Sequence, residues 1–148
     1  MLQLTKRTEY GLIAMVHLAT PAPEPVSARE IAETYNVPRR LLAEVLKDLC
    51  REGLVESTRG AQGGYSLARP AEDVSVGQVV AALEGRPSMS SCESLGAWHN
   101  VTKSCDVEPR CPIRSPLHQI RDGIWRLMEN TSLRSLANPS HTRTSLRA

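Results

Sequence analysis

Phenylalanine is absent from the 148 residues, and aromatic residues make up only 3% of the chain. A hydrophobic core must therefore be built from aliphatic side chains, which the apolar content of 41% allows. The formal net charge is only +2, so overall charge does not indicate a nucleic-acid-binding protein. The positions of individual charges have to be considered instead.

Long apolar runs are also missing. No segment approaches the roughly 20 apolar residues of a membrane-spanning helix, and the N-terminus lacks the apolar core of a secretion signal. We therefore expect a cytoplasmic protein without a membrane partner, where thiols stay reduced. The chain shows no paired catalytic carboxylates and no nucleophile beside a base. The glycine-rich residues 60–64 open no helix and are not a phosphate loop, so we do not expect an enzyme.

The most informative segment, residues 27–70, predicts two short helices and a hairpin. Ser27 and Glu30 have the spacing of a capping box, which begins the first helix. Asn36 can take the left-handed turn conformation, Pro38 suits the first position of the second helix, and Gly53 caps its end. Two alternating strands around residues 60–64 complete a winged helix-turn-helix. The predicted apolar face of the first helix consists of Ala28, Ile31, Ala32 and Tyr35, and the predicted buried stripe of the second consists of Leu41, Leu42, Val45, Leu46 and Leu49.

Such a unit lays its second helix in the major groove of DNA, with the N-terminal residues of that helix nearest the bases. Arg39 and Arg40 occupy the first turn of this helix, and Arg59 lies in the wing. These positions favour DNA binding over a small helical domain whose arginines are merely solvated. The candidate DNA-binding residues are Arg39, Arg40, Glu44, Lys47, Arg59, Gln62 and Tyr65.

Three further helices are predicted. Residues 8–19 form the first helix of the chain, with Glu9 in its first turn and a packed His17. Ser75 and Gln78 form a second capping box, and Gly85 ends the helix that follows. A long helix opens at Pro116 behind Ser115. Its apolar stripe is longer than a small domain would bury, which predicts pairing with the same helix of a second subunit. That stripe consists of Leu117, Ile120, Ile124 and Leu127, widened by Trp125 and Met128.

Three of the four cysteines, Cys92, Cys105 and Cys111, lie in an aperiodic segment with the spacing C-x12-C-x5-C. Soft thiolates gathered in a reducing compartment select zinc or an iron–sulfur cluster, although this spacing matches neither zinc ribbons nor ferredoxins. From the residues alone, solvated thiols or a thiol–disulfide pair are equally open. Cys50 lies beside Leu49 in the second helix of the DNA-binding unit, where we expect a buried structural thiol.

With these motifs the chain resembles the Rrf2 family of bacterial transcription regulators over residues 1–138. The resemblance is carried by LTKRTEYGLIAMVHLA, by LCREGLVESTRGAQGGYSLARP, by VSVGQVVAALEG, by the three-cysteine segment and by ENTSLRSLA. It implies a homodimeric winged-helix repressor or activator with a long helix crossing the dimer. It also implies that Cys92, Cys105 and Cys111 bind an iron–sulfur cluster, of the 2Fe-2S or 4Fe-4S type.

The fourth ligand differs among branches of this family. The branch that regulates cluster biogenesis has a histidine three residues after the last cysteine, where this chain has Arg114, and His118 lies one helical turn further on. The nitric-oxide-sensing branch uses an acidic residue of the partner subunit, and Glu9 stands at that position. We therefore expect Glu9 to complete the site, and a carboxylate is a weaker ligand for iron than a thiolate. His99 leaves a Cys3His zinc site as the alternative.

The sequence thus predicts a mostly α protein with a small β-hairpin wing and a long C-terminal dimerisation helix. We divide it into a winged helix-turn-helix domain (1–85), a cysteine-bearing segment (86–114), a dimerisation helix with a C-terminal turn (115–137) and a disordered tail (138–148). The predicted function is a DNA-binding repressor that senses nitric oxide, redox state or cluster supply. A zinc-bound or metal-free thiol regulator is the alternative.

Overall fold

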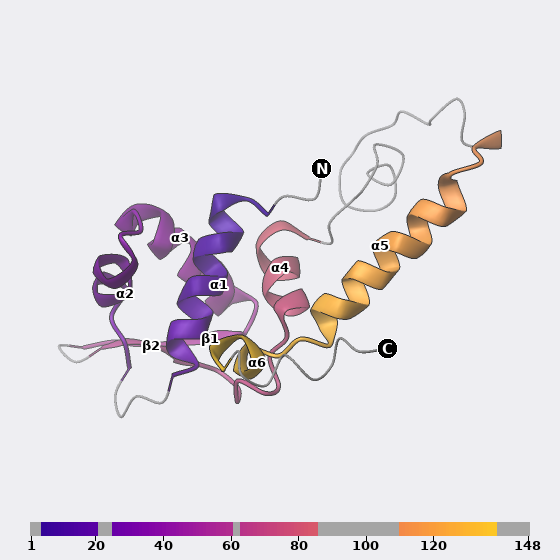
Figure 1. The fold of residues 1–148 in the computed structure, drawn as a ribbon. Helices are drawn as coiled ribbons and strands as arrows, with labels where there is room; N and C mark the ends of the chain where they lie inside the picture. The colour runs from indigo at the N-terminus through magenta and orange to yellow at the C-terminus, as the bar shows by residue number, and fades with distance from the viewer. Residues whose placement is uncertain (1–3, 21–24, 61–62, 86–109, 139–148) are drawn as a thin grey trace.

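The computed structural model describes residues 4–20, 25–60, 63–85 and 110–138, and the chain is mostly helical with one two-stranded hairpin (Figure 1). In chain order its elements are α1 (Lys6–Leu18), α2 (Ala28–Tyr35), α3 (Arg39–Arg51), β1 (Val55–Thr58), β2 (Gly64–Leu67), α4 (Val76–Glu84), α5 (Arg114–Glu129) and α6 (Leu133–Ala137). This arrangement confirms the predicted winged helix-turn-helix followed by a long helix. The predictions for Gln62, Cys92, His99, Cys105 and the C-terminal tail beyond Asn138 lie outside the described residues.

Local sequence signals explain where the helices of the central motif begin and end. The Ser27 hydroxyl accepts a hydrogen bond from the Glu30 amide at 3.1 Å and so caps α2. Asn36 ends α2 with φ 52° and ψ 42°, a left-handed conformation that asparagine tolerates better than most residues. Pro38 is the N-cap of α3, one residue before the position predicted, and Gly53 has φ 69° just after this helix. The capping box of Ser75 and Gln78 is complete in α4.

Two aliphatic clusters form the core. One joins α1 and α4 to the C-terminal half of α3, with Met15, Val45, Leu49 and Val79 fully buried, and the other packs α2 against α1 and α3. Four of the five stripe residues predicted for α3 are fully buried, and Leu41 is partly buried. Each buried aliphatic side chain contributes about 1.5–3 kcal/mol, so α3 is fixed firmly in the domain.

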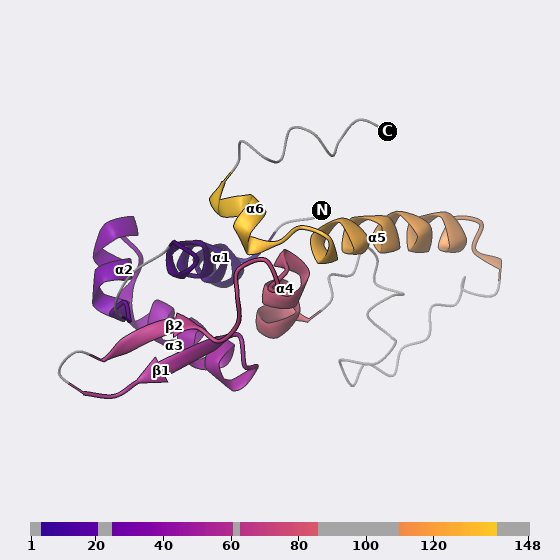
Figure 2. The same cartoon turned by 90° about the horizontal axis from the view of Figure 1, so that it is seen from below.

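The hairpin forms the wing. Val55 pairs with Leu67 and Thr58 with Gly64 in antiparallel register, and Val26 extends the sheet by two backbone hydrogen bonds with Tyr65 of 2.8 and 2.9 Å. Gly64 is required here because a Cβ at this position would lie 2.7 Å from the Val26 carbonyl oxygen. In Figure 2, β1 runs away from α4 and α5, and β2 returns toward them.

Within the described part of the chain, the C-terminal end of the long helix α5 packs against α4, where Glu129 lies beside Gly77. None of its residues is buried, whereas the turn that follows is anchored by hydrogen bonds from Val76 N to Thr131 O and from Leu133 N to Val74 O, both 2.8 Å. Leu133 of α6 is fully buried in the core. In Figures 1 and 2, α5 extends away from the winged domain. None of the described helices is long and apolar enough to cross a membrane.

The structure differs from the sequence predictions for Tyr35 and for the start of α5. Tyr35 was assigned to the apolar face of α2, but it is 43% exposed, because its hydroxyl lies 3.1 Å from Nδ1 of His17 and its ring packs edge-on against that imidazole at the surface. Helix α5 begins at Arg114, so Ser115 and Pro116 lie inside its first turn. A proline is tolerated there because N–H groups of the first turn have no partner within the helix.

Candidate nucleic-acid interface and metal ligands

The two elements that carry the arginines predicted to bind DNA are α3 and the hairpin. Arg39 and Arg40 are the first two residues of α3 and both are exposed, as is Arg59, which directly follows β1. The start of α3 and the hairpin tip both lie on the side remote from α5 in Figures 1 and 2. This placement lets one DNA duplex meet both the helix and the wing.

Arg40 has the most solvent-exposed side chain among the paired cations of α2 and α3, at 94%. Its Nε lies 3.4 Å from Oε1 of Glu44, one turn further along α3. Lys47 is exposed on the same helix. Glu44 therefore pairs with an arginine through Oε1, and its other carboxylate oxygen could accept a hydrogen bond from a cytosine amino group.

Tyr65 differs from the other predicted DNA-binding residues. Its side chain is partly buried and packs against both core clusters, while its backbone pairs with Val26. These contacts give it a structural role in holding the wing against α2. Its contact with DNA stays a prediction.

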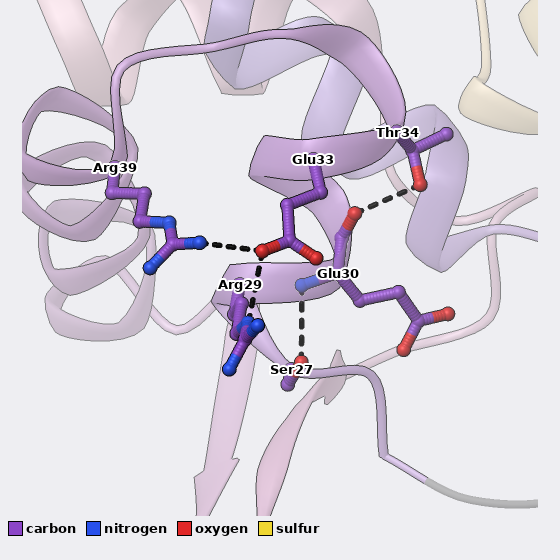
Figure 3. A network of polar contacts seen from close by, with 6 residues as sticks. All are labelled: Ser27, Arg29, Glu30, Glu33, Thr34 and Arg39. Atoms are coloured by element: carbon purple, nitrogen blue, oxygen red, sulfur yellow. Dashed lines mark hydrogen bonds and ion pairs between the residues drawn. The ribbon is translucent and has the colours of Figure 1, made fainter.

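The sequence did not predict an ion-pair network that lies at the α2–α3 turn. Oε1 of Glu33 accepts hydrogen bonds from Nε of Arg29 at 2.9 Å and from Nη2 of Arg39 at 2.5 Å (Figure 3). The i, i+4 spacing of Arg29 and Glu33 could have been noticed in the sequence. The approach of Arg39 could not, because it depends on the angle between two helices.

Polar contacts also tie the start of α1 to α3 and α4. The Glu84 carboxylate accepts hydrogen bonds from the Thr5 backbone N–H at 3.0 Å and from the hydroxyls of Thr5 and Thr8, while Arg7 forms an ion pair with Asp48 of α3. Residue 84 is the last of α4, beyond which the cysteine-bearing segment begins. The first turn of α1 is therefore bonded both to the origin of that segment and to the DNA-reading helix.

These contacts set the charge state of Glu84. Partial burial of the carboxyl raises its pKa, but the hydrogen bonds from Thr5 and Thr8 lower it more, so the net pKa lies below the ordinary value of 4.5. A depressed carboxyl pKa means that stability gained from the ionised group is present above pH 4.5 and is lost as the pH falls through the lower, folded-state pKa.

We therefore expect Glu84→Gln to lower the free energy of unfolding at pH 7 by at most about 1 kcal/mol, because the carboxylate is largely solvated. The difference between variant and wild type should shrink as the pH falls below 4.5. Urea unfolding at pH 7 and at successively lower pH measures it. An undiminished difference in acid would show that the charge of Glu84 is not responsible.

Of the predicted metal ligands, Glu9 and Cys111 are described. Glu9 lies in the first turn of α1 and forms an ion pair with Lys6 at 2.5 Å. Cys111 is partly exposed three residues before α5 begins. The starts of α1 and α5, the helices nearest to these two residues in the chain, lie apart in both views. Within the described ranges, no three His, Cys, Asp or Glu residues gather closely enough to hold a metal.

Cys50 has the environment expected of a structural thiol. It is partly buried against the core cluster of α1, α3 and α4, and burial raises the pKa of its thiol. A thiol that is harder to ionise is a poorer metal ligand. Of the four cysteines, Cys92, Cys105 and Cys111 therefore remain the candidate thiolate ligands of a metal ion or cluster.

Sequence and structural comparisons agree with this architecture. The sequence model of Rrf2, described as an iron-dependent transcriptional regulator, matches residues 4–139. The chain belongs to the Rrf2 family. It is 29% identical over 136 residues to the HTH-type transcriptional regulator NsrR of Halalkalibacterium halodurans, with 91% of this chain and 90% of that protein covered.

Three solved structures show how closely the Rrf2 fold is matched. CymR of B. subtilis, the global cysteine regulator, has a TM-score of 0.70 at 28% identity, covering 93% of this chain and 97% of CymR. IscR of T. potens has a TM-score of 0.71 at 26% identity, covering 99% and 94%. A further match is the oxidized form of Staphylococcus aureus CymR, at TM-score 0.70 and 30% identity, covering 93% and 97%. The protein is thus an Rrf2-type transcription regulator with a winged-helix fold.

Proposed function

We propose that this Rrf2 regulator is a homodimeric repressor whose affinity for a pseudo-palindromic operator is controlled by an iron–sulfur cluster. The observation that carries DNA binding is the placement of Arg39 and Arg40 at the exposed start of α3, on the same side of the molecule as the wing. Two such helices, one in each subunit, would enter successive major grooves about one helical turn apart.

The wing would contact the adjacent minor groove or backbone through Arg59 and Gln62. We expect Arg59→Ala to weaken operator binding by about tenfold, because one arginine contact to DNA is worth on the order of 1–3 kcal/mol. A gel shift on DNA from the protein's own promoter measures this. Arg69→Ala, an exposed arginine after β2, is the matched control and should bind like the wild type. Equal affinity of Arg59→Ala and wild type would remove Arg59 from the interface.

Dimerisation would use the long helix. Ile120 and Leu127 lie two turns apart on one face of α5 and are 51% and 58% exposed. Leu117 and Ile124 are only partly buried. An apolar face of this length on a helix without buried residues suits pairing with a second copy.

Cys92, Cys105 and Cys111 would hold the cluster, and Glu9 of the partner subunit would complete the site. The description of the family as iron-dependent and the similarity to NsrR and IscR support this assignment. When bound, an iron–sulfur cluster supplies a group that reacts with small oxidants or nitric oxide, most readily at an iron with a weak carboxylate ligand. Glu9 pairs with Lys6 through Oε2 only, so Oε1 would be the oxygen offered to the cluster while that ion pair is kept.

The residues that would pass the signal to DNA lie at the start of α1. Glu84 binds Thr5 and Thr8 where the cysteine-bearing segment begins, and Arg7 pairs with Asp48 of α3. Glu9 lies in the same first turn of α1, so binding of its carboxylate to the cluster would act on these contacts. Moving α1 would thus move α3 and change the spacing of the two DNA-reading helices.

A zinc-bound or metal-free thiol regulator is the second candidate. The similarity to CymR, a cysteine regulator also solved in an oxidized form, favours it. In that case His99 would complete a Cys3His zinc site, or two of the three thiols would form a disulfide with loss of two electrons to an oxidant. Metal analysis distinguishes these candidates.

A further inference from the structure

Glu33 lies where the two helices of the DNA-binding motif meet, and a single oxygen of its carboxylate serves both. In Figure 3 the side chains of Arg29 and Arg39 converge on that oxygen from α2 and α3. The hydrogen bond from Arg29, helped by the charge of Arg39, holds the pKa of Glu33 below its ordinary value. The carboxylate is therefore ionised at neutral pH.

All three side chains of this network are more than half exposed. Exposed ion pairs add little to folding stability, and neither arginine needs Glu33 to compensate for burial. The network therefore changes the surface charge more than the stability, because one negative charge offsets two positive charges beside the start of α3. This offset matters because cations at that surface determine how strongly DNA of any sequence is attracted.

Arg39 can keep this contact and still reach DNA. A guanidinium carries five N–H donors in a rigid plane, and the Glu33 contact is made at Nη2. The pairing restricts the positions that the guanidinium samples, which favours a defined contact with a base over a loose contact with any nearby phosphate.

We propose that Glu33 is a specificity-determining residue of the DNA interface: it holds the guanidinium of Arg39 in place and suppresses attraction of Arg29 and Arg39 to phosphates of arbitrary DNA. This inference rests on the proposed function, since it requires α3 to contact DNA. Arg39 then reads the operator from a fixed position, and Glu33 lowers the affinity for unrelated sequences.

The test compares Glu33→Gln with Glu30→Gln in the full-length protein. Both substitutions remove one exposed negative charge from α2, but in Figure 3 the Glu30 carboxylate points away from Arg29 and Arg39. Binding to an operator duplex selected from random DNA, and to an unrelated duplex of equal length, is measured over a series of salt concentrations.

For Glu33→Gln we expect affinity for unrelated DNA to rise about tenfold at low salt, with a slope of log K against log salt steeper by about 0.9 for each phosphate newly contacted. Operator affinity should change by less than about threefold, so the specificity ratio falls. Glu30→Gln should show only the smaller effect of removing a remote charge. The difference between the two variants should disappear when Arg29 and Arg39 are both alanine.

Equal salt slopes and equal specificity ratios for the two variants would overturn the role of Glu33, and so would a fall in affinity for both duplexes. Persistence of the effect without the two arginines would overturn it as well. These outcomes leave the proposed function intact if the wild type prefers its operator. A wild type without any sequence preference would overturn both proposals.

Discussion

Replacing Ile120 and Leu127 of α5 together by Glu should convert the protein to a monomer and weaken operator binding by roughly 100-fold or more. Burying each of these side chains in a dimer contributes about 1.5–3 kcal/mol, and two-fold symmetry counts each side chain twice. The substitutions also bring unpaired carboxylates into the contact. A single subunit would then bind only one half-site, without the gain from holding both.

The matched control is Gln119→Glu with Arg126→Gln. These residues have the same spacing and are exposed on α5, but lie one position before the apolar stripe, and each pair of substitutions lowers the net charge by two. Light scattering gives the mass in solution and a gel shift gives the affinity. Because α5 has no buried residue, circular dichroism should show an intact winged domain in both variants. A double-glutamate variant that stays dimeric would exclude α5 as the dimer interface.

The parts of this fold that could be predicted from sequence are those determined by neighbouring residues. The cap of Ser27, the left-handed Asn36 and the capping box of Ser75 and Gln78 each involve residues within a few positions, so spacing alone identifies them. The stripe of α3 was predicted because burial on one face repeats with the helical period.

Contacts between distant segments could not be predicted in this way. Arg7 meets Asp48, and Glu84 meets Thr5, across separations that carry no periodic signal. The exposure of Tyr35 was missed because its partner, His17, comes from another helix. In each case the pairing follows from how helices pack, which a single sequence does not encode in its local pattern.

The same distinction between local signals and distant contacts applies to the candidate site. Arg39, Arg40 and Arg59 were recognised because the motif assigns them positions at the helix start and in the wing, and all three are exposed. Glu33 carries no such motif position and became visible only through its contact with Arg39. The three-cysteine set was recognised from residue type, and the arrangement of these ligands stays a prediction.

Replacing Cys92, Cys105 or Cys111 singly by Ser should remove the iron and acid-labile sulfide from anaerobically purified protein and abolish any response of operator affinity to oxidants or nitric oxide. A cluster held by three thiolates and one carboxylate loses a quarter of its ligands with each substitution. The matched control is Cys50→Ala, because Cys50 packs against the core and should not ligate. It should keep the metal content of the wild type with slightly lower stability.

Glu9→Ala tests the contribution of the fourth ligand separately from that of the three cysteines. Because a carboxylate binds iron more weakly than a thiolate, this variant should retain cluster in the absence of air but lose it faster on exposure to oxygen. The substitution also frees Lys6, so Lys6→Ala is needed beside it and should leave the rate of loss unchanged. Stoichiometric zinc without sulfide would assign the site to Cys3His ligation with His99. Protein with neither metal, whose DNA affinity still falls on oxidation and recovers with a reductant, would assign the signal to the thiols themselves.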